Sequence, residues 1–157
     1  MTATAHALVA GAIASKFTDP VTASALALTS HFIMDAVPHW DVGTNWRKRS
    51  KNATGLFAII ETVVGILVAY YFFGSRASFP LLSLAIFFSL LPDWLETPWY
   101  IFFAGQKKHE PSKNASIWEK LTFRIYKTEN AFHTKAQFPF GVITQIATVI
   151  FFLVLLK

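Results

Sequence analysis

Five apolar segments, separated by polar or charged stretches, dominate the pattern of the chain. They are Ala3 to Ser15, Val21 to Val37, Gly55 to Phe73, Phe79 to Phe103 and Phe138 to Leu156. A helix needs about 20 apolar residues to cross the hydrocarbon core of a membrane, so the last three segments are long enough by themselves. The first two are shorter and rich in small residues, which let two helices approach closely. We therefore predict that these two form a tight helical hairpin.

The long hydrophilic stretch before the last apolar segment contains one more helical pattern. Its apolar residues recur three or four positions apart, which is typical of an amphipathic helix lying on a membrane surface. These residues are Ile117, Trp118, Leu121, Ile125 and Tyr126. The predicted fold is all-α: an integral membrane bundle of about five apolar helices in a single domain of residues 1–157, with an amphipathic surface helix in the long basic loop.

The composition favours a membrane protein over a water-soluble one. Of the 157 residues, 54% are hydrophobic, 16% are aromatic and only 15% are charged, and the mean hydropathy is +0.43. A soluble domain usually carries roughly 25% charged residues. There is no cysteine, which removes disulfides, thiolate metal ligands and a cysteine nucleophile.

The positive charges gather in two of the loops and predict the orientation of the chain. The loop from Val42 to Thr54 carries Arg47, Lys48, Arg49 and Lys51, and the loop from Gln106 to Lys135 carries seven basic residues, Lys107 and Lys108 among them, against three glutamates. With five spans both basic loops fall on one side, and the positive-inside rule places them in the cytoplasm with the N-terminus. We predict a multi-pass protein of the cell (inner) membrane whose net charge of +5 attracts anionic phospholipid headgroups rather than nucleic acid. His109, in the hydrophilic loop, is expected to be solvated.

The stretch from Ser30 to Asp41 places two histidines and two aspartates at the end of an apolar run. His31 and Asp35 stand four residues apart, so on a helix they project from the same face. Imidazole beside carboxylate can hold a divalent metal ion, and ionisable groups in a membrane segment usually mark function. We predict a metal site here; the structural alternative is a hydrogen bond or ion pair that joins helices.

The predicted topology brings other acids and histidines to the same side of the membrane. Glu61 lies about two turns into its span, because a helix rises 1.5 Å per residue. The predicted metal ligands are His6, His31, Asp35, His39, Asp41, Asp93 and His133, and the predicted catalytic carboxylates are Glu61 and Glu96. Such a cluster suits metal-assisted hydrolysis, with Glu61 or Glu96 as general base. Zinc is the favoured ion and manganese the alternative, and the number of ligands allows one or two ions.

Three features along the chain resemble a known family. They are His6 followed by Gly11, the Leu91-Pro92-Asp93 motif at the end of an apolar helix, and His133 at the head of a later helix. Together they resemble the YdjM-like family, whose members are predicted membrane-bound metal-dependent hydrolases. The resemblance implies a metal-dependent hydrolytic activity.

Two further stretches bear on this resemblance. Ser30-His31 through Asp41 resembles a His-x-x-x-Asp variant found in short members of the family. The family's His-Arg-Gly-x-Thr-His-Ser motif is missing, and Phe132-His133-Thr134 resembles only part of it. The His-x-x-x-Asp helix is also similar, more weakly, to zinc-dependent phospholipase C and related nucleases. That similarity implies a phosphoester substrate in or near the lipid headgroup.

Three functional hypotheses stay open at this point. The first is a hydrolase of phospholipids or other amphiphilic esters. The second is a small transporter or channel for a divalent ion or proton, which predicts ionisable groups on both sides of the membrane midplane. The third is a non-catalytic scaffold whose polar residues hold helices together.

Overall fold

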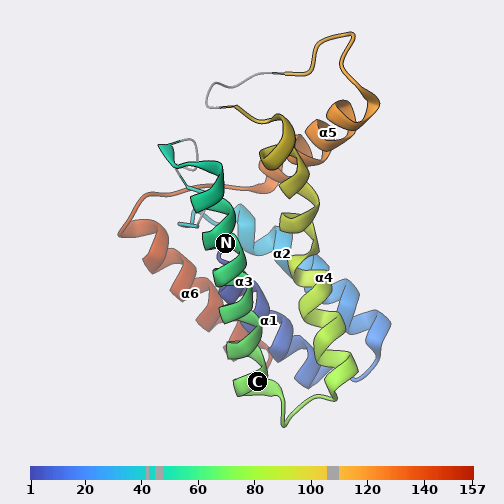
Figure 1. The fold of residues 1–157 in the computed structure, drawn as a ribbon. Coiled ribbons are helices and arrows are strands. Elements are labelled where there is room, and N and C mark those ends of the chain that lie inside the picture. Colours follow the sequence, from blue (N-terminus) through green and yellow to red (C-terminus); the bar gives the residue numbers. More distant parts are fainter. Residues whose placement is uncertain (42, 45–47, 106–109) are drawn as a thin grey trace.

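The fold consists of six α-helices (Figure 1), in a computed structural model that describes residues 1–157 except 42, 45–47 and 106–109. Arg47, Lys107, Lys108 and His109 lie outside the described residues. The helices are α1 (Ala3–Lys16), α2 (Pro20–Ala36), α3 (Lys51–Phe73), α4 (Phe79–Pro98), α5 (Ile117–Phe132) and α6 (Phe140–Leu155), and a π-helical turn, η2 (Trp99–Phe103), continues α4. The described part of the chain contains no β-strand, so the predicted all-α class is confirmed.

The helix boundaries follow local capping signals. Asp19 accepts a hydrogen bond from the Thr22 amide at the start of α2, where Pro20 occupies the first turn. Ser116 caps α5 in the same way, through the Glu119 amide. Each of the five apolar segments contains a helix, and the amphipathic stretch forms α5.

Helix α1 is the centre of the fold. It packs against α2, α3, α4 and α6, and it is buried on nearly every face, as expected for a helix that is apolar all round. Its small side chains permit close contact: a Cβ atom on Gly65 of α3 would lie 2.9 Å from the Thr4 Cα atom. The small residues therefore serve contacts with α3 as well as the expected contact with α2.

The outer faces of α3 and α6 are strongly apolar. Their exposed residues include Leu56, Phe57, Ile60, Val63 and Leu67 on α3, and Ile143, Ile146, Ile150, Phe151 and Val154 on α6. Exposed apolar surface on this scale marks a face that contacts a membrane or another protein. Two helices, Lys51–Phe73 and Phe79–Phe103, are long and apolar enough to cross a membrane, and α6 is a shorter apolar helix. These features agree with the predicted membrane protein, and the bundle of five spans stays a prediction.

Helix α5 lies across the ends of α2 and α4 (Figure 1). Trp99 of η2 is buried beneath it, with its ring centroid 4.9 Å from that of Phe123 and 5.8 Å from that of Tyr126. From the end of α5 the chain crosses back past the end of α2 and enters α6. This crossing brings residues that are distant in sequence to one end of the bundle.

Candidate metal centre

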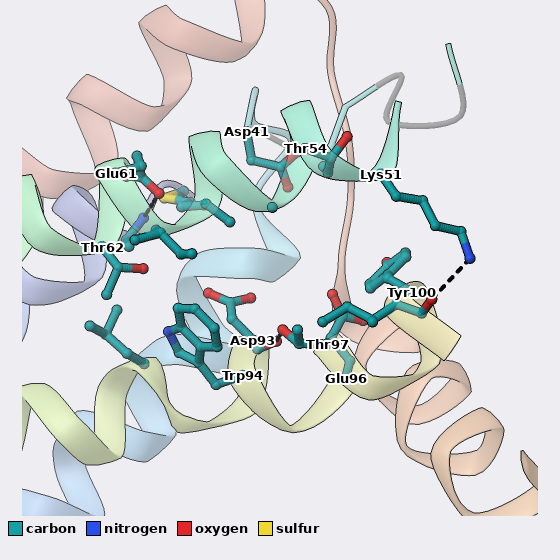
Figure 2. A pocket seen from close by; sticks show the side chains of 18 residues that line it. Asp41, Lys51, Thr54, Glu61, Thr62, Asp93, Trp94, Glu96, Thr97 and Tyr100 are labelled. Atoms are coloured by element: carbon teal, nitrogen blue, oxygen red, sulfur yellow. Dashed lines mark hydrogen bonds between the residues drawn. The ribbon is translucent and has the colours of Figure 1, made fainter. Parts of the chain in front are cut away.

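A cavity of about 210 Å³ opens between the first half of α3 and the last part of α4 (Figure 2). Asp41, Asp93 and Glu96 line it together with Lys51 and Tyr100. The buried Oε2 atom of Glu96 has no hydrogen-bond partner. The cavity thus presents carboxyl groups from two elements, and one of their oxygens has no partner.

Glu61 also lines this cavity, but its oxygens are engaged. Oε2 accepts a hydrogen bond from the Ala3 amide (2.8 Å), and Oε1 accepts one from the Thr4 amide (2.9 Å). These amides belong to the first turn of α1, whose N–H groups lack partners within the helix. Glu61 therefore caps the central helix from α3. Its role as a general base stays a prediction, as does that of Glu96.

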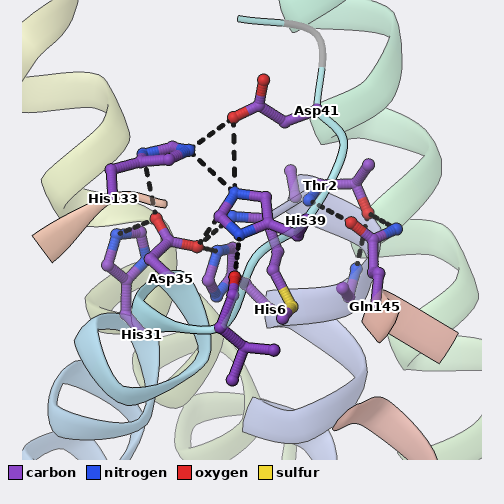
Figure 3. A network of polar contacts seen from close by, with 12 residues as sticks. Thr2, His6, His31, Asp35, His39, Asp41, His133 and Gln145 are labelled. Atoms are coloured by element: carbon purple, nitrogen blue, oxygen red, sulfur yellow. Dashed lines mark hydrogen bonds and ion pairs between the residues drawn. The ribbon is translucent and has the colours of Figure 1, made fainter. Parts of the chain in front are cut away.

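The predicted metal ligands form two adjoining groups beside the cavity, and most of them are labelled in Figure 3. In each group the ligand atoms all lie within 4.8 Å of one another. Group A is defined as His6, His31 and Asp93, and group B as Asp35, His39 and His133. Asp41 joins group B through contacts with both histidines. All seven predicted ligands thus lie in one region, where the buried groups could hold a metal ion.

Asp35 lies between the two groups and faces both. Toward group A, its Oδ1 atom is 3.1 Å from His6 Nε2 and its Oδ2 atom is 3.5 Å from His31 Nε2. Toward group B, Oδ2 is 3.3 Å from His133 Nδ1 and Oδ1 is 3.8 Å from His39 Nε2. The Met1 amino group also contacts Oδ1. A single buried carboxylate therefore connects four imidazoles.

Backbone carbonyls orient two of these imidazoles. His31 Nδ1 donates a hydrogen bond to the Ser89 carbonyl (2.7 Å), and His39 Nδ1 donates one to the Val37 carbonyl (2.7 Å). Because a carbonyl can only accept, the proton is on Nδ1 and the lone pair of Nε2 is directed into the cluster. This arrangement is typical of histidines that bind metal ions.

Two buried imidazole nitrogens lack a hydrogen-bond partner, namely His31 Nε2 and His6 Nδ1. His6 donates through Nε2 to Asp35, so its Nδ1 atom carries a lone pair. A buried polar atom without a partner costs free energy comparable to a lost hydrogen bond. A metal ion would satisfy such lone pairs, so the residues fit a metal centre by their own chemistry.

His133 and Asp41 are held in the protonation states that metal binding requires. Burial lowers the pKa of His133, although the hydrogen bond to Asp41 and the charge of Asp35 act to raise it. Burial would raise the pKa of Asp41, but the hydrogen bond from His133 and the charge of Lys135 hold it well below its usual value. His133 Nε2 lies 2.6 Å from Asp41 Oδ2 and 2.8 Å from His39 Nε2. A neutral imidazole and an ionised carboxylate are the forms that bind metals.

Backbone pairing brings His39 and His133 together. The His39 amide donates to the Thr134 carbonyl (3.0 Å), and the Ala136 amide donates to the His39 carbonyl (2.7 Å). The Thr134 amide also donates to the Asp35 carbonyl (2.9 Å). The residues after α5 therefore lie beside the residues that follow α2. This long-range pairing completes group B.

The structure adds one acidic residue that the sequence reasoning did not place at the site. Glu129 of α5 has its Oε2 atom 4.0 Å from His31 Nε2, and its side chain is 13% exposed. Burial, and after it the charge of Asp35, raises the pKa of Glu129 to about 7. Its position four residues before His133, on the buried face of an amphipathic helix, was the signal that could have identified it.

Replacing Glu129 with glutamine is expected to stabilise the metal-free protein at pH 8 but not at pH 5. The folded-state pKa of about 7 lies above the ordinary 4.5. The stability contributed by the protonated carboxyl is therefore lost as the pH rises from 4.5 through 7. Thermal unfolding with a chelator present should give a melting temperature a few degrees above wild type at pH 8 and equal to it at pH 5. Glu110→Gln, at an exposed position, is the control, and an equal shift at both pH values would contradict the expectation.

The comparisons with known proteins add no assignment to this geometry. No family model matches the chain, and no curated protein or solved structure matches it. The fold and the site define an all-helical protein with an apolar exterior and a buried histidine–aspartate cluster that could hold a metal ion. The resemblance to the YdjM-like family stays a prediction.

Proposed function

We propose that the protein is a membrane-bound, metal-dependent hydrolase that acts on a phospholipid or another amphiphilic (phospho)ester at the cytoplasmic leaflet. The observation that carries the proposal is the position of Asp35 between two groups of buried imidazoles, in a bundle with an apolar exterior. Histidine and aspartate ligands without thiolate favour zinc, with manganese as the alternative.

Each part of the cluster has a separate role in this proposal. Group A would hold one ion and group B with Asp41 a second, with Asp35 serving both. A divalent ion supplies Lewis-acid chemistry, activating water near neutral pH and polarising a phosphoryl or carbonyl oxygen. Glu96 lines the cavity with Asp93 and has an unpartnered oxygen, whereas both oxygens of Glu61 are engaged, so Glu96 is the better placed of the two predicted bases.

The surroundings of the cluster support an amphiphilic substrate. Trp94 and Ile59 line the cavity, and both are partly exposed on the apolar surface. Basic side chains of the loops would attract anionic headgroups in the leaflet that they face. We assign this face to the cytoplasm because of the positive-inside rule, in a protein of the cell (inner) membrane with several spans.

Metal content and hydrolysis, measured on the same purified preparation, test the proposal. We expect one or two equivalents of zinc or manganese by elemental analysis. Phosphomonoester, phosphodiester and carboxylic ester substrates are then offered in mixed micelles. We expect the protein to hydrolyse at least one of these classes. A chelator should abolish that activity, and added zinc or manganese should restore it. A folded preparation without metal that hydrolyses none of these substrates would overturn the proposal.

Two further measurements separate the alternatives. A divalent-ion transporter or channel predicts metal-dependent flux in proteoliposomes, whereas a hydrolase predicts product release without flux. A scaffold predicts that substitution of Asp35 lowers the free energy of unfolding equally with and without metal. The hydrolase hypothesis predicts that the substitution lowers the free energy of unfolding more with metal than without it, because bound metal stabilises the folded protein.

A further inference from the structure

A second cavity, of about 430 Å³, lies between α3 and α4 along the apolar part of the two helices. Its lining is mainly aliphatic and aromatic, and includes Ile66, Tyr70, Phe79, Ile86, Phe87 and Leu91. The two helices make only sparse contact with each other, while both pack on α1. The volume falls in the usual range for pockets that bind small molecules.

This apolar cavity adjoins the cavity at the metal centre. Thr62, Leu90 and Trp94 line both of them. The two cavities meet at these residues and are together called the groove, with Asp93 and Glu96 at one end and the apolar region between the helices at the other. Measured along α3 from Thr62 to Tyr70, the apolar part is about 12 Å long at 1.5 Å per residue.

The walls of the apolar part offer few unpaired polar groups. The Tyr70 hydroxyl lies 2.6 Å from Ser83 Oγ, and Ser83 Oγ donates to the Phe79 carbonyl (2.7 Å). A polar ligand such as a sugar would lose its hydrogen bonds to water here without replacement. An alkyl chain has no hydrogen bonds to water to lose, and burial of its apolar surface is favourable.

The groove opens on the apolar surface of the protein. Phe79 and Phe87 on its rim are 72% and 57% exposed, and Trp94, where the two cavities join, is 41% exposed. A chain that lies in lipid could therefore enter sideways, while its polar end reaches the carboxylates. The groove thus matches an amphiphile in both chemistry and direction.

We propose that the groove between α3 and α4 binds one alkyl chain of the substrate and places the ester at its polar end beside Asp93 and Glu96. The inference rests on the proposed function for the identity of the reacting group. It specifies the substrate class as a single-headed amphiphile with a long unbranched chain. Affinity should then rise about fourfold for each added methylene until the apolar part is filled.

The test combines a chain-length series with a groove-filling variant. Binding of alkyl phosphates from butyl to tetradecyl to the zinc-loaded protein is measured by native mass spectrometry, and hydrolysis of the matching esters is measured in parallel. Ile66→Trp narrows the groove and should weaken binding of the dodecyl compound at least tenfold while leaving the butyl compound unchanged. Leu67→Trp, at the next position on α3 but 63% exposed and outside the groove, should change neither.

A second variant enlarges the groove instead of narrowing it. It distinguishes a specific effect on binding from misfolding of the first variant. Phe87→Ala enlarges the groove at its exposed rim and should extend the rise in affinity to longer chains. Affinity that is independent of chain length, or that changes equally in Ile66→Trp and Leu67→Trp, would overturn the groove proposal. Chain-length-dependent binding without hydrolysis of any ester would leave the groove in place and remove the hydrolase. Hydrolysis without chain-length dependence would support the hydrolase and overturn the groove proposal.

Discussion

Replacing Asp35 with asparagine is expected to remove bound metal from groups A and B together. The Asp35 carboxylate lies within 3.8 Å of four imidazoles, two in each group. Asparagine keeps the shape of the side chain but removes the negative charge and one of the two acceptor oxygens. Mutation of a residue that only hydrogen-bonds to a metal ligand already lowers metal affinity 10–100-fold. We expect loss of Asp35 to lower it by at least about 100-fold, with hydrolysis falling in parallel.

The matched control for this variant lies on the same helix. Asp19 is the N-cap residue of α2, is fully exposed, and accepts a hydrogen bond from the Thr22 amide. Asparagine is as good a residue at this capping position, so Asp19→Asn should retain both fold and metal. Zinc titration by isothermal calorimetry, with thermal unfolding of the metal-free proteins, gives both quantities. Unchanged zinc affinity in Asp35→Asn would exclude the proposed role of Asp35.

The sequence predicted the helices because their signals are local. The apolar segments are long, the loops between them carry charge or proline, and the spacing from Ile117 to Tyr126 repeats with the helical period. The structure has a helix in each of these places. The convergence of histidines and acids was also predictable, since the charges of Arg49 and Lys51 and of the long loop predict a common side for both loops.

The detailed geometry of the site depends on contacts that no local signal encodes. The Ser89 carbonyl orients His31 across 58 residues, and His39 meets His133 across 94. Glu61 lines the cavity, yet its oxygens cap α1 through the Ala3 and Thr4 amides. Capping by a side chain from another helix depends on tertiary packing, and a pattern within one segment does not reveal it.

The second large effect is expected from replacing Gly141 with alanine, although Gly141 is not itself a predicted ligand. A Cβ atom at this position would lie 2.6 Å from the Trp40 amide nitrogen, 2.7 Å from the Ala136 carbonyl oxygen and 2.9 Å from the His39 carbonyl carbon. All three are backbone atoms, so no side-chain rotation relieves the overlap. Overpacking of this kind costs about 1–3 kcal/mol. The start of α6 or the paired segments that carry His39 and His133 must therefore move apart.

Gly141→Ala should consequently weaken group B and spare group A. A cost in the middle of that range corresponds to a loss of zinc affinity of about tenfold or more at group B. Zinc titration should then show one site near its wild-type affinity and one weakened. Gly55→Ala is the matched control, because no atom lies within 4 Å of its Cβ position and alanine favours a helix. If both sites weaken equally in Gly141→Ala, Asp35 couples the two groups so tightly that they act as one centre, and the separate assignment of the two groups would be wrong.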